Sequence, residues 1–364
     1  MITLKDFEKS RIYVDGLLSG SMTIDDVAKL SGLNRDTIRK AWCNELLGGY
    51  TVAKMNLQDT RDEDNATRKT IRENTRRMRD IEWLGELLRD EGVKRYPLIE
   101  RPNYQHGEEN EDVIAVLSDL HIGQEYSNYV DSYNIEIASN RLGVFCDKLL
   151  DCTFEGDTIH LFVLGDLIEN IHLHKSTALE VRMDNVEQLK RVTDMLGSFI
   201  YRIIDNYRSV KVYIVGGNHD RLYEKDKVLR DERFSDIVSY ILEREFAHFP
   251  EVTFVQNLEP TIAQAYIGGH YTVGVHGDLN DSQIDRYLKE KPEIILKGHN
   301  HKFKIEEDYD CFTLQNGALC GSGSDYCIKG RLNARPEQTI LKVNESGVVD
   351  IIPVFFNRES EMIR

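Results

Sequence analysis

The sequence predicts an α/β fold in which sheets pack on each other, preceded by a small all-α region. From about residue 111, short apolar runs rich in Val and Ile each end in a polar cluster, as is typical of buried strands. The segments 139–151 and 186–205, which separate the first three runs, are predicted to be helices. The C-terminal part, at 252–276 and 311–355, is rich in strand-forming residues, which favours packed sheets. The apolar runs are VIAVL, IHLFVL, VKVYIV, YTVGV and EIIL.

Length and composition fit one large domain and a smaller one. The chain has 364 residues, of which 41% are hydrophobic and 30% charged. Its first ten residues, MITLKDFEKS, carry charges where a signal peptide needs an apolar core. No stretch approaches the roughly 20 apolar residues of a membrane span. We therefore expect a cytoplasmic protein without membrane contact. The six cysteines are scattered without a C-x-x-C pair, so we expect reduced core residues.

The net charge of −16 argues against a protein that coats nucleic acid by bulk electrostatics, because phosphate neutralisation needs clustered Lys and Arg. A local basic groove remains compatible with this charge. Carboxylates that bind metal can also account for part of the acidity, since a bound cation would offset them.

Residues 1–54 are predicted to form a helix-turn-helix domain. Apolar residues recur with helical spacing on both sides of Gly32, and Thr23 and Asn34 supply N-cap signals for two helices. Such a domain can bind DNA through its second helix, but a small helical packing module is the alternative. The candidate DNA contacts on the second helix are Arg35, Arg39 and Lys40.

Residues 55–110 are predicted to form a charged helical linker. The segment 56–95 is almost free of Gly and Pro, and four arginines recur in it at spacings of four, four and three. This stripe can contact a phosphate backbone, or it can be the solvated face of a helix. A helix of this length can also pair two protomers, so a homodimer is expected. The arginines are Arg68, Arg72, Arg76 and Arg79.

Within the domain predicted at 111–364, polar clusters follow five apolar runs within one or two residues. In open α/β sheets, ligands gather at the carboxyl ends of strands, so these clusters should converge on one crevice. Their side chains offer mixed oxygen and nitrogen ligands, sufficient for two divalent ions. Mn²⁺ is the first expectation, with Fe, Zn, Ni and Mg as alternatives. The clusters are SDLH at 118–121, GD at 165–166, GNHD at 217–220, GVHG at 274–277 and GHNH at 298–301.

The ordered set D-x-H, GD, GNHD, VHG and GHxH resembles that of the calcineurin-like metallophosphoesterase superfamily over residues 113–305. The resemblance implies a four-layer αββα sandwich with two metal ions about 3.5–4 Å apart. It implies a first ion bound by Asp119, His121, Asp166 and His301. It implies a second ion bound by Asp166, Asn218, His276 and His299, so that Asp166 is the bridge.

The same resemblance implies the catalytic groups. His219 would lie beside the phosphate, either as general acid or as a cation that stabilises transition-state charge. Asp220 would orient the His219 ring. A metal-bridging hydroxide would be the nucleophile.

The residues around the motifs narrow the substrate. Calcineurin-like protein phosphatases carry an Arg shortly after Gly-Asp, whereas this sequence reads GDLIENIHLHKS, with Asn170, His172, His174 and Lys175. SDLHIGQ is nearer to the double-strand-break repair nucleases, although their proline-rich continuation after Gly-Asp is missing. The chain also resembles phage or prophage metallophosphoesterases with an N-terminal helical module.

We therefore expect a metal-dependent phosphodiester hydrolase that acts as a DNA nuclease. One alternative is a phosphoesterase for a small substrate, such as a cyclic nucleotide or a phosphomonoester. The other is a DNA-binding regulator with an inactive phosphoesterase domain, against which the intact ligand set argues. Further along the chain, Tyr326, Arg331 and Arg335 can line the substrate groove or occupy strand ends and a turn.

Overall fold

A computed structural model of the chain defines two units, Met1–Glu82 and Trp83–Arg364, which we describe separately. The residues that the structure describes are 13, 16–17, 19–36, 38, 96–97, 112–152, 158–171, 181–223, 229, 232–257, 259–278, 288 and 290–358. No helix within these ranges is both long and apolar enough to cross a membrane.

The first unit contains helix α2, Ile24–Ser31. Thr23 caps it as expected: its hydroxyl accepts from the backbone N–H of Asp26, and the Asp26 carboxylate accepts from the backbone N–H of Thr23. Gly32 ends the helix with φ 68°, a conformation that favours glycine. The helix expected after Asn34 is described only in part, so the helix-turn-helix stays a prediction. Arg39, Lys40, the four arginines of the stripe and the expected dimer helix lie outside the described residues.

The second unit contains a six-stranded sheet, in the order β13-β12-β1-β4-β5-β6. Strands β1, β4, β5 and β6 run parallel, while β12 pairs antiparallel with β1 and with the edge strand β13. The strands are β1 (Asp112–Leu117), β4 (Thr158–Leu164), β5 (Ser209–Val215), β6 (Val252–Phe254), β12 (Glu337–Asn344) and β13 (Gly347–Phe355).

A five-stranded sheet, in the order β10-β11-β9-β8-β7, packs against the first. Strands β8, β9 and β11 are parallel, while β7 and β10 are antiparallel edges. The strands are β7 (Ile262–Ile267), β8 (His270–Val275), β9 (Ile294–Lys297), β10 (Lys304–Asp308) and β11 (Cys311–Gln315). A small hairpin pairs β2 (Tyr126–Ser127) with β3 (Ser132–Tyr133).

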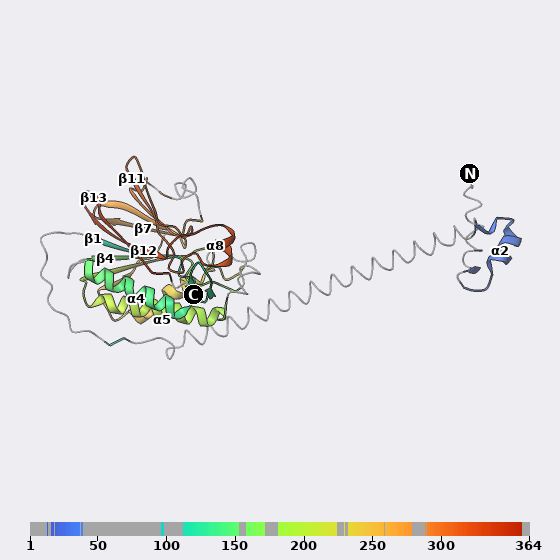
Figure 1. Cartoon of the computed structure of the whole chain (residues 1–364), viewed down its shortest axis with the longest axis horizontal. Helices are drawn as coiled ribbons and strands as arrows, with labels where there is room; N and C mark the ends of the chain where they lie inside the picture. Colours follow the sequence, from blue (N-terminus) through green and yellow to red (C-terminus); the bar gives the residue numbers. More distant parts are fainter. Residues whose placement is uncertain are drawn as a thin grey trace. The chain divides into compact units, whose positions relative to one another are not determined.

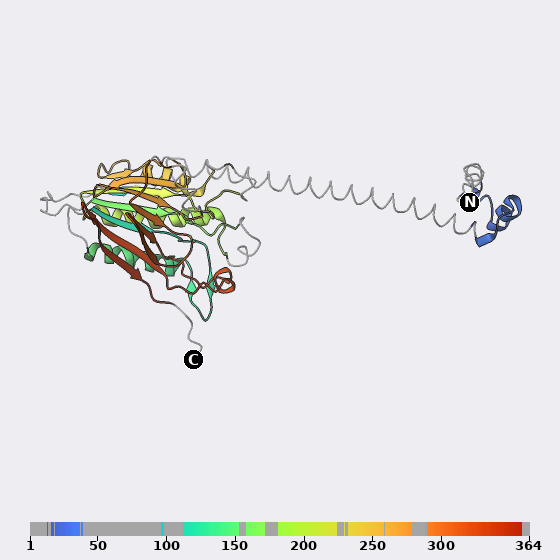
Figure 2. The same cartoon turned by 90° about the horizontal axis from the view of Figure 1, so that it is seen from above.

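Alternating side chains of the six-stranded sheet enter two different cores. Val113 and Ala115 pack with helices, whereas Ile114 and Val116 pack against the second sheet. Helices α4 (Ile135–Cys152) and α5 (Asn185–Ile204) cover the helical face (Figure 1), and Figure 2 shows the same layers from above. Helix α6 (Phe234–Glu245) joins them, and α8 (Asp325–Lys329) is a short helix near the C-terminus.

The predicted α/β fold with packed sheets is confirmed. The five apolar runs form β1, β4, β5, β8 and β9, and both expected helices are present as α4 and α5. Three layers of the expected αββα sandwich lie within the described residues. On the outer face of the five-stranded sheet, a cluster that includes Tyr271 and Val273 packs with Leu288. Residues 279–287 beside it are outside the described ranges, so the fourth layer stays a prediction.

Candidate metal centre

The loops that follow β1 and β4 are held together by backbone hydrogen bonds beyond the ends of the strands. The N–H of Asp119 donates to the carbonyl of Gly165 at 3.1 Å, and the N–H of His121 donates to that of Asp166 at 2.9 Å. Because these bonds join the two loops beyond the last paired residues of the strands, the side chains of both loops occupy fixed positions at the carboxyl edge of the sheet.

The second sheet contributes His276 after β8, and His299 and His301 after β9. The N–H of Gly298 donates to the carbonyl of His276 at 2.8 Å, which joins these two loops. The N–H of His299 donates to the Asp119 carboxylate, with distances of 3.1 and 3.0 Å to its two oxygens. The polar clusters of both sheets therefore meet at one place, as the motif positions predict.

Five of the seven predicted metal ligands have a left-handed backbone. The φ angles are 53° for Asp119, 46° for His121, 50° for Asp166, 73° for His299 and 54° for His301. A non-glycine residue in this region costs on the order of 1–3 kcal/mol, and such strain is concentrated at functional sites. The fold thus maintains an unfavourable backbone at the residues whose side chains converge.

Two glycines allow the loops after β4 and β5 to approach each other. Gly165 has φ 80°, and a Cβ added to it would lie 2.4 Å from the backbone nitrogen of Gly217. A Cβ on Gly217 would lie 2.2 Å from Oδ1 of Asp166. Neither position has space for a side chain, so glycine is required for this contact.

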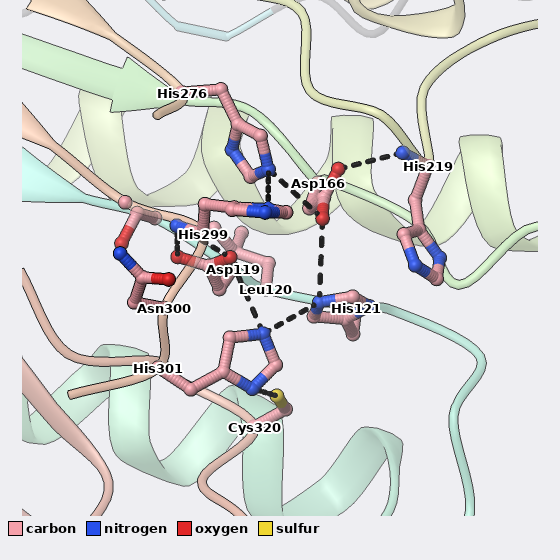
Figure 3. A network of polar contacts seen from close by, with 12 residues as sticks. Asp119, Leu120, His121, Asp166, His219, His276, His299, Asn300, His301 and Cys320 are labelled. Atoms are coloured by element: carbon pink, nitrogen blue, oxygen red, sulfur yellow. Dashed lines mark hydrogen bonds and ion pairs between the residues drawn. The ribbon is translucent and has the colours of Figure 1, made fainter. Parts of the chain in front are cut away.

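Asp166 lies at the centre of the converging side chains (Figure 3). Its Oδ2 is 3.1 Å from Nε2 of His276 and 3.7 Å from Nε2 of His121. On one side, His121 Nε2 is 3.2 Å from His301 Nε2, which is 3.4 Å from Asp119 Oδ1. On the other side, two further contacts of 3.1 Å join His276 with Asn218 and His299.

The second nitrogen of each central imidazole is used as a donor. His276 Nδ1 donates to the carbonyl of Leu164 at 2.8 Å, and His121 Nδ1 donates to the Glu169 carboxylate at 2.7 Å. In the neutral tautomers that these bonds favour, both Nε2 lone pairs face Asp166. Metal-binding histidines are characteristically oriented in this way. The residues present therefore fit divalent metal ions.

Several sets of ligand atoms lie within 4.8 Å of one another. Two of them share Asp166: Asp119 with His121 and Asp166, and Asp166 with His276 and His299. Two others are His121 with Glu169 and His219, and His121 with His301 and Cys320. These are candidate metal-binding groups.

The electrostatics of the centre favour positive charge. Burial opposes ionisation of Asp166, but His276 and His219 beside it hold the pKa of that carboxyl well below its usual range. Burial would lower the pKa of His276, yet Asp166 and Asp119 raise it to about 10. A proton on His276 and a divalent cation would therefore compete for the same carboxylates.

His219 lies beside this cluster, with its ring edge toward His121 at 4.7 Å between ring centroids. Its backbone N–H donates to Oδ1 of Asp166 at 2.7 Å, and its Nδ1 donates to the carbonyl of Glu169 at 2.7 Å. Burial opposes the charged ring, but Asp166 and Glu169 outweigh it and raise the pKa of His219. The imidazolium form is thereby favoured.

The expected contact between Asp220 and the His219 ring is corrected by the structure. The Asp220 carboxylate accepts the backbone N–H groups of Asp166, Leu167 and Gly217 at 2.7–2.9 Å. Both oxygens are engaged there, and the His219 ring bonds to the Glu169 carbonyl instead. Asp220 therefore joins the loops after β4 and β5, and it acts on His219 through their geometry.

Sequence reasoning gave no role to Glu169, although the quoted GDLIEN segment contains it. This carboxylate is only 2% exposed, and besides His121 it accepts from Nε2 of Gln124 at 3.1 Å. Asn170 lies in the neighbourhood where calcineurin-like protein phosphatases carry an Arg. Its Nδ2 donates to the carbonyls of His219 and Arg221 at 2.8 and 2.6 Å, which holds the GNHD loop. In the sequence, the feature that could indicate this role of Glu169 is an acidic residue three positions after Asp166.

Two buried thiols lie on the far edge of the His301 ring. Cys327 Sγ is 3.6 Å and Cys320 Sγ is 4.0 Å from His301 Nδ1, whereas Nε2 of the same ring faces Asp119 and His121. Burial raises the pKa of the Cys320 thiol to about 11, so it is protonated at neutral pH. Both cysteines thus orient His301.

A cleft of about 270 Å³ opens over the cluster. It is lined by His121, Asp166, Asn218, His219, His299 and His301, and on another side by Tyr326, Lys329 and Leu332. Arg335, a second candidate for the groove, lies over the Phe355 ring at 5.0 Å. Arg331 is exposed with φ 55°.

The candidate nucleic-acid contacts are described only at Arg35, which is exposed and pairs with Asp25 at 2.8 Å. His172, His174 and Lys175 lie outside the described residues, with Arg39, Lys40, Arg68, Arg72, Arg76 and Arg79.

Chains with low similarity to this one are found among solved structures. An archaeal phosphodiesterase shows 14% identity with a TM-score of 0.37, covering 67% of this chain and 99% of the other. Vps29 from Entamoeba histolytica, solved as a single mutant, shows 15% identity and a TM-score of 0.33, with coverage of 67% and 99%. A predicted phosphoesterase from Streptococcus pneumoniae shows 14% identity and a TM-score of 0.32, with coverage of 70% and 94%.

A comparison with curated proteins gives no match. The sequence model of the calcineurin-like phosphoesterases, by contrast, matches residues 113–343, which include every motif that follows a strand in the centre described above. The chain therefore belongs to the calcineurin-like phosphoesterase family.

Proposed function

We propose that the chain is a phosphodiester hydrolase that uses two divalent metal ions, Mn²⁺ first among them, and that its substrate is DNA. The observation that carries this proposal is the position of Asp166, which belongs to two ligand groups and whose Oδ2 faces both His276 and His121. A carboxylate shared by two groups is the arrangement that a pair of neighbouring ions requires.

The ligands divide into two sets around Asp166. Asp119, His121 and His301 would complete the set for one ion, and Asn218, His276 and His299 would complete the set for the other. The short contacts within each set support the division, since His276 lies within 3.1 Å of both Asn218 and His299. When bound, the ions would supply Lewis-acid charge at the phosphate and an activated water as nucleophile.

A histidine of the chain would donate the proton to the leaving group. His219 lines the cleft, and the raised pKa of its ring favours the protonated form that a general acid needs. The carbonyl of Glu169 accepts from Nδ1, which leaves Nε2 directed away from this bond as the proton donor. As an imidazolium, His219 would also stabilise charge that develops on the phosphoryl oxygens.

The preference for DNA rests on the N-terminal sequence. A helix-turn-helix pattern and an arginine stripe have an evident use with a nucleic-acid polymer and none with a small ester. The lack of an Arg shortly after Gly-Asp also separates the sequence from the calcineurin-like protein phosphatases. A small phosphodiester such as a cyclic nucleotide is the second candidate, favoured by the modest volume of the cleft.

The test combines metal counting with turnover. The purified protein should bind two Mn²⁺ ions per chain by isothermal titration and degrade single- or double-stranded DNA, and EDTA should stop the reaction. His219→Ala should lower kcat by roughly 10²–10⁴-fold while still binding metal, because the ring acts on the phosphate. His248→Ala, at an exposed histidine of the same domain, is the matched control.

If the protein hydrolyses a cyclic nucleotide rapidly and cleaves no DNA, its substrate is a small phosphodiester and the DNA proposal is wrong. Gel-shift binding of DNA without metal-dependent turnover would favour a regulator instead.

A further inference from the structure

Helix α8 presents a large aromatic ring beside the candidate metal centre. Tyr326 is 78% exposed and Leu332 is 37% exposed, although both line the same cleft as His219 and Asp166. The rest of that cleft is formed largely by polar and ionisable side chains. An exposed tyrosine in such a place needs an explanation, because the fold gives its ring few contacts.

The opposite side of α8 is fixed to a predicted metal ligand. Cys327, next to Tyr326, is 1% exposed and its Sγ lies 3.6 Å from Nδ1 of His301. The N–H of Leu332 donates to the carbonyl of Cys327 at 2.8 Å, which holds the residues after the helix. Ser324 caps the helix by accepting from the N–H of Cys327 at 3.3 Å. The position of the Tyr326 backbone is therefore tied to that of His301.

The loop before α8 is packed equally closely. A Cβ on Gly323 would lie 2.2 Å from the ring of Tyr126, and the N–H of Gly323 donates to the Tyr126 hydroxyl at 3.3 Å. Asn128 Nδ2 donates to the carbonyl of Gly323 at 2.7 Å. Tyr326 is thus an exposed ring on a well-packed support, which is the property of a pre-organised binding surface.

We propose that Tyr326, flanked by Leu332, is a platform on which the base of a nucleotide stacks while its phosphate lies at the metal centre. This inference rests on the proposed function and specifies its substrate. Every base has a π-face, so one aromatic ring can bind any sequence, and stacking contributes about 1–3 kcal/mol per base. Lys329 and its ion-pair partner Asp325, on the same helix, also line the cleft.

The Tyr326 platform would bind single-stranded or unstacked nucleic acid in preference to a duplex. A base within a duplex is stacked on both faces, so it has no face free for Tyr326 until it is unstacked. The cleft volume of about 270 Å³ is at the lower end of small-ligand pockets. The occupant is therefore one nucleotide of a single-stranded or frayed end, with its scissile phosphate at the metals.

Binding of thymidine 5′-monophosphate and of inorganic phosphate to the Mn²⁺-loaded full chain tests the platform without turnover. The nucleotide should bind about 5- to 150-fold more tightly than phosphate, as the stacking range implies. Tyr326→Ala should remove this difference and leave phosphate affinity unchanged, whereas Tyr326→Phe should retain it. Tyr309→Ala, at a 91% exposed ring outside the cleft lining, is the matched control.

Turnover separates this inference from the proposed function. Tyr326→Ala should raise the KM for dithymidylate by a similar factor and leave hydrolysis of glycerophosphoethanolamine, a diester without an aromatic ring, unchanged. If both esters are hydrolysed but Tyr326→Ala binds the nucleotide as the parent protein does, the platform is wrong and the hydrolase stands. If neither ester reacts but the binding difference depends on Tyr326, the platform stands and the hydrolase is wrong. The platform is also wrong if the parent protein binds the nucleotide and inorganic phosphate equally tightly.

Discussion

At the scale of single residues, Glu169 connects two groups with different predicted tasks. Its carboxylate is 2.7 Å from Nδ1 of His121, a candidate ligand, and 3.8 Å from Nδ1 of His219. Its own backbone carbonyl accepts from that second ring. One buried residue thus fixes the orientation of both imidazoles, as carboxylates do for metal-binding histidines.

Glu169→Gln should weaken Mn²⁺ binding by about 10- to 100-fold, because the amide cannot stabilise the His121 tautomer as the carboxylate does. Isothermal titration with Mn²⁺ measures the change. Glu187→Gln, on the half-exposed Glu187–Arg191 pair of α5, is the control and should bind as the parent protein does. Parental affinity in Glu169→Gln would show that His121 does not need this partner.

Glu337 is a second buried acid, separate from the metal centre. It accepts the N–H of Gly317 at 2.8 Å and the hydroxyl of Thr339 at 2.6 Å, and burial raises its pKa from 4.5 to about 7. The folded state therefore retains this proton to higher pH than the unfolded state does. Its stabilising contribution is full below pH 4.5 and is lost as pH rises to about 7.

Glu337→Gln, which resembles the protonated acid, should remove this pH dependence. Relative to the parent protein, the variant should gain up to about 3 kcal/mol of unfolding free energy between pH 5 and pH 8. Urea denaturation in EDTA at both pH values gives the difference, with the exposed Glu306→Gln as control. If the difference in unfolding free energy between variant and parent protein is the same at both pH values, the pKa of Glu337 is not raised by folding.

The donor residues of the centre were predictable because each motif places them directly after an apolar run. The contacts of Glu169 and Asp220 were not, because they depend on how loops far apart in sequence fold against each other. Asp220 accepts the backbone N–H groups of Asp166 and Leu167 in the loop after β4, and no spacing along the chain reveals a bond of this kind.

At the scale of elements, the contact between the loops after β4 and β5 requires that Gly217 has no side chain. Gly217→Ala should displace Asp166, lower the free energy of unfolding by about 1–3 kcal/mol and weaken Mn²⁺ binding. Gly143→Ala is the matched control, since a Cβ there meets nothing within 4 Å and lies on helix α4. It should stabilise the protein by up to about 1 kcal/mol.

Thermal unfolding with and without Mn²⁺ measures the stability of both glycine variants and how much Mn²⁺ binding increases it. A Gly217→Ala protein that gains as much thermal stability from Mn²⁺ as the parent protein would contradict the crowding argument.

Strands with an apolar face were predictable, and strands without one were not. The buried runs of β1 and β4, VIAVL and IHLFVL, are apolar apart from His160, because the sheet is covered on both faces. Strand β10 is exposed along its whole length and has the sequence KIEED. It is a strand because it pairs with β11, which is a tertiary property.

At the scale of the whole molecule, the predicted DNA contacts and the candidate metal centre belong to different units. The metal centre lies entirely within the second unit, while the helix-turn-helix pattern and arginine stripe lie in the first. Tyr96 belongs to the second unit, where its ring stacks on Tyr201 and Phe246 at 4.7 and 5.0 Å between centroids. A truncated protein should therefore retain Tyr96.

Deletion of residues 1–82 should leave hydrolysis of a small chromogenic diester unchanged and lower activity on polymeric DNA, because the predicted phosphate contacts are removed. The salt dependence of DNA binding should weaken as well, since each lost contact reduces the logarithmic slope by about 0.9. Titrating KCl against DNA affinity for both proteins measures this, and retained diester turnover is the control for folding. Equal slopes and equal activity on DNA would instead assign the N-terminal unit to another partner, such as a second copy of the chain.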